Sequence, residues 1–443
     1  MRLSGFMPRL LAGIACVLFI LLLPGIVSTA ENDSAHKLAS ERWHAWRTSR
    51  NDFPLAAWSY FNRYEGSYEE FKLYRDAGLT MVTPTKEQYP NAVRAGLDII
   101  AGHLDPLHES EEALRDVVTF PKPDDRTVVA YSLKDEPTAD LFPALGRTTA
   151  YLYRNDRRNA IPIIDFRPNW SVPYPRWNMT YETYFERYLD EVAPCVLLNC
   201  HYPLMRDGST RPVFYANIEY YRAKALDLDI GLMGFILVTA HRYPASPQID
   251  YRAPSESDIR WIAYTYLAYG AQGLWYYNWR IESEQFGSAI VDGPTGQPTP
   301  YYTIVQALNR EICAISPVLM KLGSTGVYHT NEIVPPGTTR FYKGYINSFH
   351  DWEGDDFILG AFDNRDDPGD DSIYVMIVNK RHAGDKRPEE ISARASFTVY
   401  PDYPAVRFLT PGEGTVYKVE RGGNTYSLDI GGGQGVLIQF SKQ

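Results

Sequence analysis

The sequence is poor in the features that mark several common classes of protein. It has only four cysteines, Cys16, Cys195, Cys200 and Cys313, which is too few for a disulfide framework. It also lacks an excess of basic residues, since 44 Lys and Arg stand against 54 Asp and Glu, giving a net charge of −10. This balance argues against a nucleic-acid partner, because phosphate binding needs a basic face.

Several motifs are missing as well. No glycine-rich phosphate-binding fingerprint follows the first apolar strand-like run at residues 55–60, which argues against an open, doubly wound sheet that holds a dinucleotide. No internal repeat or long low-complexity tract is present, and no closely spaced His and Asp motif suggests a metal site. We therefore expect neither a cofactor nor a bound metal.

The N-terminal segment has the pattern of an export signal. Arg2 and Arg9 precede an uncharged apolar run at residues 10–27, and the small residues Ser28 and Ala30 lie where signal peptidase reads them. We predict a signal peptide over residues 1–30 and a secreted or periplasmic protein. The alternative is an uncleaved membrane anchor, because the apolar run approaches spanning length.

After a lead-in at residues 31–52, short apolar runs alternate with amphipathic helical patterns. This alternation is typical of repeated βα units around a parallel sheet. Eight such units predict a closed (β/α)₈ barrel, a TIM barrel, over residues 53–317. The predicted strands are residues 55–60, 80–83, 97–101, 127–133, 161–166, 195–202, 231–239 and 273–277. The predicted helices are residues 67–77, 110–118, 139–154, 181–191, 213–228, 255–269 and 301–315.

The character of the sequence changes after Pro317. Short strand-like runs separated by turn residues fill the remainder, at residues 357–362, 372–378, 396–399, 406–409, 415–419, 425–428 and 435–440. This pattern predicts an antiparallel β-sandwich over residues 318–443. Its simplest role is to pack against the barrel.

The best candidate for a catalytic group is Glu136, in the motif Lys134-Asp135-Glu136-Pro137 at the end of the fourth strand. Barrel enzymes carry their chemistry at the C-terminal ends of the strands, and Pro137 both ends the strand and fixes the backbone beside the acid. Burial in a barrel mouth raises the pKa of a carboxylic acid into the range useful for general acid catalysis. Asp135 is expected to alternate to the other side of the strand and to fix the loop.

Several further stretches, taken in order, resemble one family. Cys200-His201-Tyr202-Pro203 resembles an Asp-x-Tyr-Pro stretch that ends strand six, residues 268–277 resemble an Ala-x-Gly-Ala-x-Gly passage into strand eight, and residues 292–311 resemble the stretch that follows. Together with the Asp-Glu-Pro motif, they make the chain similar to the barrel glycoside hydrolases of clan A, particularly the β-galactosidase-like barrels of family 42 and cellulase-like relatives. The resemblance implies that Glu136 is the acid/base of a glycosidase.

Two positions depart from that family. Cys200 stands where the relatives commonly have Asp, and residues 232–243, around strand seven, carry no carboxylate where a retaining enzyme has its nucleophilic Glu. Asp165 at the end of strand five and Glu282 after strand eight are equal candidates for the second carboxylate. Glu284 follows strand eight too, and Asp250 is a more distant candidate.

The remaining candidates are binding groups at strand ends. The sequence is rich in aromatic residues, with 33 Tyr and 9 Trp, and such rings stack on sugar faces while His, Asn and Arg bind hydroxyl groups. The predicted substrate-binding residues are Trp58, Tyr60, His103, Asp135, His201, Tyr202, His241, Arg242, Trp275, Tyr277, Asn278 and Trp279.

Three functions fit these observations. The leading one is a secreted glycoside hydrolase that acts on a poly- or oligosaccharide with Glu136 as acid/base. The second is a non-catalytic carbohydrate-binding protein that kept the barrel and lacks the strand-seven nucleophile. The third is a metal-dependent hydrolase in which His103, His201 and His241 converge with Asp165.

Overall fold

A computed structural model describes residues 29–59, 61–103, 110–171, 178–246, 248–281, 283–410 and 417–442, without the side chains of residues 29–32, 103, 111, 417 and 418. Most of the predicted signal peptide, residues 1–28, therefore lies outside the described residues. Within these ranges, no helix combines the length and the apolar character needed to cross a membrane.

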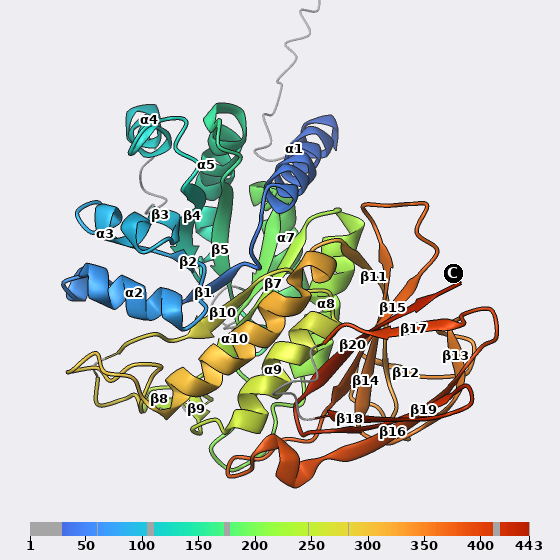
Figure 1. Cartoon of the computed structure of the whole chain (residues 1–443). Coiled ribbons are helices and arrows are strands. Elements are labelled where there is room, and N and C mark those ends of the chain that lie inside the picture. Colours follow the sequence, from blue (N-terminus) through green and yellow to red (C-terminus); the bar gives the residue numbers. More distant parts are fainter. Residues whose placement is uncertain are drawn as a thin grey trace, which may run out of the picture.

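The first part of the chain is a closed barrel of eight parallel strands in the order β1-β10-β7-β6-β5-β4-β3-β2 (Figure 1). Each of the eight predicted runs coincides with or overlaps one of these strands, so the predicted TIM barrel is confirmed. The strands are β1 (Leu55–Ala57), β2 (Met81–Val82), β3 (Asp98–His103), β4 (Val128–Asp135), β5 (Ile161–Phe166), β6 (Val196–Asn199), β7 (Gly231–Leu237) and β10 (Leu274–Tyr277). A short hairpin, β8 (His241–Arg242) and β9 (Asp250–Tyr251), follows β7.

Helices surround the barrel, and their starts follow local sequence signals. Ser67, Ser110 and Thr180 each accept a hydrogen bond from a backbone N–H of the first turn, and Ser255 with Asp258 forms a capping box. The α-helices are α2 (Tyr68–Asp76), α3 (Tyr89–Arg94), α4 (Glu111–Thr119), α5 (Phe142–Asn155), α7 (Tyr181–Val192), α8 (Phe214–Asp227), α9 (Glu256–Ala268) and α10 (Pro300–Leu319). The 3₁₀ turns are η1 (Phe61–Arg63), η2 (Ala139–Leu141) and η3 (Pro388–Ile391).

A further helix, α1 (Thr29–Thr48), closes the N-terminal end of the barrel and was not predicted. Trp43 and Trp46 stack on each other with ring centroids 5.3 Å apart, and both are buried. The Trp46 indole N–H donates to the carbonyl of Val129 at 2.8 Å, and the Trp43 ring occupies the space above Gly231. Since these residues lie at the starts of β4 and β7, α1 covers the face opposite the strand ends that carry the candidate site.

The C-terminal part is a β-sandwich, as predicted. One sheet has the order β12-β11-β14-β15-β20-β17 and the other has the order β13-β16-β19-β18. Their strands are β11 (Leu322–His329), β12 (Thr339–Arg340), β13 (Phe349–Glu353), β14 (Phe357–Asn364), β15 (Ile373–Asn379), β16 (Ala393–Val399), β17 (Ala405–Phe408), β18 (Tyr417–Gly422), β19 (Thr425–Ile430) and β20 (Gly435–Ser441). The two inner faces enclose a separate apolar core.

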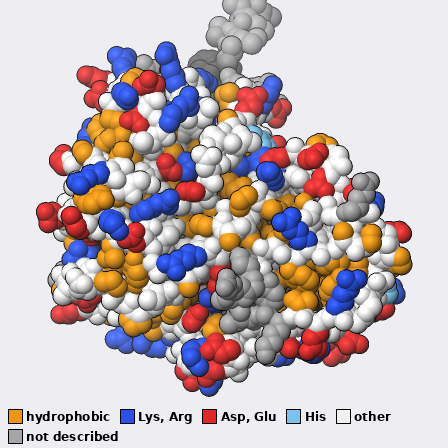
Figure 2. Space-filling view, viewed as in Figure 1, with side chains coloured by type: hydrophobic (Ala, Val, Ile, Leu, Met, Phe, Trp, Pro, Cys, Tyr) orange, Lys and Arg blue, Asp and Glu red, His pale blue; other side chains and the backbone are white. Residues whose placement is uncertain are grey.

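The sandwich packs on α9, with β14, β15 and β20 in contact with that helix (Figure 1). The contact is close, since a Cβ added at Gly360 would lie 2.2 Å from the carbonyl oxygen of Ala268. Buried polar groups also join the two parts: Arg260 donates to Glu311 at 2.8 Å and to Gln434 at 2.9 Å. Figure 2 shows acidic and basic side chains interspersed over one face of the molecule, without a continuous basic patch on that face.

Candidate active site

A cavity of about 190 Å³ lies at the C-terminal ends of the barrel strands. Acidic groups form one side of it and aromatic rings the other. Its lining residues are Trp58, Asp135, Glu136, Asp165, Pro168, Trp170, Cys200, Tyr202, His241, Tyr243, Ile249, Tyr251 and Tyr277. The sandwich contributes no residue to this lining within the described ranges.

Two consecutive acids at the end of β4 both line the cavity. Successive side chains of a strand normally point to opposite faces, but Glu136 has a positive φ of 43°, which breaks that alternation. Its N–H donates to the carbonyl of Asp165 at 2.9 Å, which ties the end of β4 to β5. The prediction that Asp135 would turn to the other side of the strand is therefore wrong. A strained backbone of this kind is concentrated at functional sites.

Asp165 is the deepest of the three carboxyl groups. It stands opposite Asp135 in the β4–β5 register, and only 7% of its surface is exposed. Burial, reinforced by the nearby Asp135 and Glu136, holds the pKa of Asp165 well above its ordinary value. Asp135 therefore contributes, together with burial, to holding the proton on the Asp165 carboxyl group.

Glu136 lies nearer the opening, with 33% of its side chain exposed. Its Oε2 atom pairs with the Arg167 guanidinium at 2.9 Å, and Arg167 also donates to the Glu136 carbonyl at 3.2 Å. Burial raises the pKa of Glu136, Arg167 opposes that rise, and Asp135 adds to it. Glu136 thus combines access to solvent with a carboxyl group that holds its proton more strongly than usual.

Aromatic side chains build the opposite wall. Tyr202 packs 5.3 Å from Tyr277, 5.6 Å from Tyr251 and 5.8 Å from His241, measured between ring centroids. Burial lowers the pKa of His241 to about 4, so this imidazole is neutral at pH 7. Trp58, from the end of β1, completes the wall.

The structure brings together only part of the predicted set. Glu136, Asp165, Asp135, Trp58, Tyr202, Tyr277 and His241 line the cavity, whereas His201, Arg242, Trp275, Asn278 and Trp279 do not. Tyr60 and Glu282 lie outside the described residues, and so does the side chain of His103. Glu284 and Arg242 are exposed outside the cavity, and Asp250 pairs with Arg206.

The excluded residues have other surroundings. The His201 imidazole bonds Asn217 at 3.0 Å beneath α8, and burial lowers its pKa to about 3. The ring centroids of Trp275 and Phe235 lie 5.7 Å apart inside the barrel, and those of Trp279 and Tyr74 lie 4.8 Å apart. Asn278 is buried. These side chains come from the right strand ends but support the site from outside it.

Apart from Cys200, five lining residues were not predicted as site residues: Pro168, Trp170, Tyr243, Ile249 and Tyr251. Pro168 and Trp170 lie in the segment after β5, and the others lie on or beside the β8–β9 hairpin. No strand-end signal marks them, because they reach the cavity from loops. Cys200 also lines the cavity, and its thiol donates to the Tyr202 hydroxyl at 3.3 Å.

The described side chains include no group of three or more His, Cys, Asp and Glu placed to hold a metal ion. The metal-dependent alternative required His201 to meet His241 and Asp165. His201 is instead enclosed behind β6 with Asn217. The structure therefore does not assemble the proposed ligand set from its described members.

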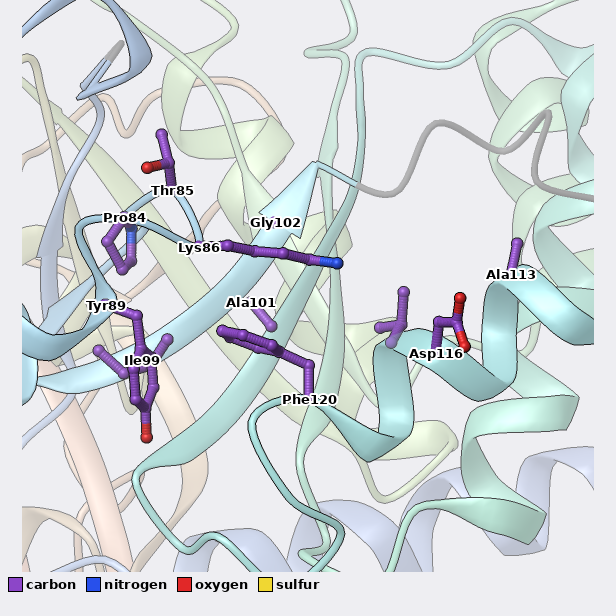
Figure 3. A pocket seen from close by; sticks show the side chains of 11 residues that line it. Pro84, Thr85, Lys86, Tyr89, Ile99, Ala101, Gly102, Ala113, Asp116 and Phe120 are labelled. Carbon is purple, nitrogen blue, oxygen red and sulfur yellow. The ribbon is translucent and has the colours of Figure 1, made fainter.

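A second cavity, of about 340 Å³, lies outside the barrel between β3 and α4. Its walls are mainly apolar, and the Lys86 side chain extends across it above the Phe120 ring, with the ammonium 5.4 Å from the ring centroid (Figure 3). Apart from Lys86 and Asp116 it carries no charged group among its described lining residues. The smaller cavity is the better candidate site because titratable groups with shifted pKa values converge on it.

No protein-family model matches the chain, and no curated protein matches it. Solved structures that resemble it are glycoside hydrolases. An α-amylase from Geobacillus thermoleovorans is 11% identical with a TM-score of 0.43, covering 84% of this chain and 91% of that one. The catalytic module of a family 98 glycoside hydrolase from Streptococcus pneumoniae is 9% identical with a TM-score of 0.40, covering 88% and 98%.

An endo-α-mannosidase of family GH99 from Bacteroides thetaiotaomicron is 10% identical with a TM-score of 0.39, covering 56% of this chain and 79% of that one. Likenesses this distant carry no argument about the reaction. The chemistry of the cavity itself has to supply that argument.

Proposed function

We propose that the cavity is the active site of a glycoside hydrolase that cleaves O-glycosidic bonds in a poly- or oligosaccharide. The observation that carries this proposal is the pair of carboxyl groups, Glu136 and Asp165, which come from neighbouring strand ends and line one cavity beside an aromatic wall. Glycosidases use two carboxyl groups that flank the bond they cleave. The aromatic rings provide flat surfaces on which a sugar ring stacks.

We base the proposed roles of Glu136 and Asp165 on their depths in the cavity. A leaving group departs toward solvent, so of this pair we take the more exposed acid, Glu136, as the general acid. Asp165, at the floor, faces the inner side of the bound sugar and acts on the anomeric carbon, either directly or through water. Hydrogen-bond donors of the substrate that reach Asp165 favour its ionised form, which this role requires.

The raised pKa of Glu136 fits general acid catalysis near neutral pH. Arg167 limits that rise, and its guanidinium stabilises the carboxylate that remains once the proton has passed to the leaving oxygen. The glycosidases that the sequence resembles place a nucleophilic Glu at the end of strand seven. In this chain Asp165 takes that function in our proposal, with Glu282 as the alternative second carboxylate.

Leaving-group dependence tests the roles of the two acids. Substrates are 4-nitrophenyl and 2,4-dinitrophenyl glycosides of the common hexoses, because the second leaving group departs without protonation. We expect Glu136→Gln to lower kcat/KM by about 10²–10⁴-fold on the first substrate and far less on the second. Asp165→Asn is expected to lower kcat/KM on both substrates. Asp140 is an exposed acid on η2, and Asp140→Asn is expected to leave kcat/KM unchanged on both.

Unchanged hydrolysis of both substrates by Glu136→Gln would overturn the proposal. The reverse pattern, with Asp165→Asn spared on the activated substrate, would exchange the roles of the two acids. Glu282→Gln belongs in the same series. If it removes activity on both substrates while Asp165→Asn does not, Glu282 is the second carboxylate.

A non-catalytic carbohydrate-binding protein is the second candidate. It is favoured by the residues that follow β7, where Val238 and Thr239 are buried and the chain continues to His241 without a carboxyl group. Tight oligosaccharide binding without turnover across a broad glycan panel would select this function. We also propose that the protein is exported, which N-terminal sequencing of the mature chain tests by locating cleavage after Ala30.

A further inference from the structure

The charge of the cavity is one-sided. Asp135, Glu136 and Asp165 are acidic, and none of the described lining residues is Lys or Arg. Arg167 pairs with Glu136 at its outer oxygen, which offsets one of the three acids. His241 adds no positive charge at neutral pH, because burial lowers its pKa to about 4. A bound ligand therefore meets a wall of hydrogen-bond acceptors with an excess of negative charge.

One of those acceptors is without a donor. The Oδ1 atom of Asp165 is buried and has no hydrogen-bond partner among the described residues, although the residue lines the cavity. An unsatisfied buried acceptor costs free energy, so such groups are satisfied by a ligand or by water. Burial and the neighbouring carboxylates Asp135 and Glu136 raise the pKa of Asp165, and a cation beside it would oppose that rise.

The opposite wall suits a cation as well. Trp58, Tyr202 and Tyr277 line the cavity, as does Tyr251, whose ring has the Arg211 guanidinium 5.7 Å from its centroid. The faces of aromatic rings carry partial negative charge and attract ammonium groups, most strongly where water is excluded. The acidic and the aromatic sides of the cavity thus both favour a positively charged ligand.

The size of the cavity limits the ligand further. Its volume of about 190 Å³ is below the roughly 300–1,000 Å³ of pockets that enclose drug-sized molecules, so it suits a single sugar ring. A neutral sugar offers hydroxyl groups that both donate and accept. An ammonium group has three donors and no acceptor, which matches a wall of carboxyl oxygens.

We propose that the cavity binds a sugar unit with a free, protonated amino group, a hexosamine, in preference to its neutral or N-acetylated counterparts. The ammonium group lies between Asp165 and the aromatic wall and donates to the free Asp165 oxygen. Its positive charge favours the ionised form of Asp165 in the complex. N-acetylation removes the charge and adds a bulky group, and it is therefore expected to weaken binding.

This inference rests on the proposed function only in taking the ligand to be a sugar. Its test measures binding of monosaccharides and not their hydrolysis. Binding of amino sugars without cleavage of any glycoside would overturn the hydrolase proposal and leave the hexosamine proposal standing. Hydrolysis with a preference for neutral sugars would overturn the hexosamine proposal and leave the hydrolase proposal standing.

The experiment is isothermal titration calorimetry at pH 6, where an amine is protonated. The probes are methyl glycosides in matched sets of three, 2-amino, 2-acetamido and 2-hydroxy, in the gluco and galacto series. We expect one 2-amino sugar to bind the wild-type protein at least tenfold more tightly than both of its counterparts. Equal or tighter binding of the 2-hydroxy or 2-acetamido member of every set, or no measurable binding of any 2-amino sugar, would overturn the proposal.

Two variants sharpen the result. Asp165→Asn keeps the shape of the side chain and removes its charge, and it is expected to reduce the preference for the amino sugar to about threefold or less. Asp140→Asn removes an exposed acid outside the cavity and is expected to keep the wild-type preference. Retention of the full preference in a folded Asp165→Asn protein would contradict the assigned contact. The wild-type comparison decides the proposal if that variant fails to fold.

Discussion

Asp156 is the centre of a buried cluster of charged side chains that holds α1 against the N-terminal end of the barrel. Its Oδ1 atom accepts hydrogen bonds from the Tyr131 hydroxyl at 2.7 Å and from Arg158 Nε at 2.8 Å. Its Oδ2 atom accepts from Arg42 Nη1 at 3.1 Å and from the backbone N–H groups of Arg158 and Ala160. One carboxylate therefore satisfies two guanidinium groups and links α1 to β4 and β5.

We predict that Asp156→Asn destabilises the protein by about 3–5 kcal/mol, the range for breaking a buried ion pair by removing one partner. The side chain of Asp156 is fully buried, as is that of Arg158, and only 6% of the Arg42 side chain is exposed. The substitution thus leaves two guanidinium groups in the interior without a counter-charge. The Asn amide also directs N–H donors at groups that themselves donate.

Urea denaturation followed by tryptophan fluorescence measures this change, because Trp43 and Trp46 lie on the same helix. The matched control is Asp229→Asn, which removes an acid that also contacts α1, through His44 at 2.8 Å, but has 65% of its side chain exposed. It is expected to cost less than about 1 kcal/mol. A loss below about 1 kcal/mol for Asp156→Asn, or one equal to that of the control, would refute the reasoning.

Three further predictions follow from the described contacts. Because the Arg167 guanidinium lowers the pKa of Glu136, Arg167→Met is expected to raise that pKa and to move the Glu136 limb of the pH–activity profile upward, whereas Arg167→Lys keeps it near the wild-type position. Burial lowers the pKa of His201 to about 3, so the stability that this residue contributes is complete above pH 6.5 and is lost as the pH falls toward 3. Between pH 5.5 and pH 4, we expect the unfolding free energy of the wild type to fall more steeply than that of His201→Gln, and the two slopes to differ by about 1.4 kcal/mol per pH unit. A Cβ at Gly146 would lie 1.9 Å from the carbonyl oxygen of Glu191, so Gly146→Ala is expected to push α5 away from α7. We expect this change to lower the unfolding free energy by about 3 kcal/mol in the same denaturation assay. An unchanged urea midpoint would contradict this close packing of α5 against α7.

The fold could be predicted because its signals are local. Each barrel strand is a short apolar run, and several of the intervening helices have a capping residue such as Ser110 or Ser255 at their start. The elements that escaped prediction lack those signals. Helix α1 buries Arg42 and Arg47 together with its two tryptophans, which interrupts the apolar stripe. Strand β11 contains Gly323 and Gly326 and has an irregular register with β14 at that point.

The site was predictable only to the level of strand ends. That rule selects the ends of β4, β5, β6 and β10, where residues of the cavity lining lie, but it does not say which side chains face inward. Alternation along a strand decides this at β6, where Cys200 and Tyr202 line the cavity and the intervening His201 turns behind it. The loop residues Trp170 and Tyr251 could not be found in this way, because their positions depend on the path of the chain after the strand.

Glu136 is where alternation fails, and the failure has a chemical result. With regular strand geometry, Asp135 and Glu136 would face opposite sides, and a single carboxyl group from β4 would meet Asp165. The positive φ at Glu136 brings both acids to the cavity, so that three carboxyl groups from two strands lie together. Burial and the proximity of the other two acids raise the pKa of Asp165. The acids of the cavity therefore come from β4 and β5, and Asp165 lies beside Glu136 although residues 238–243, after β7, carry no carboxyl group.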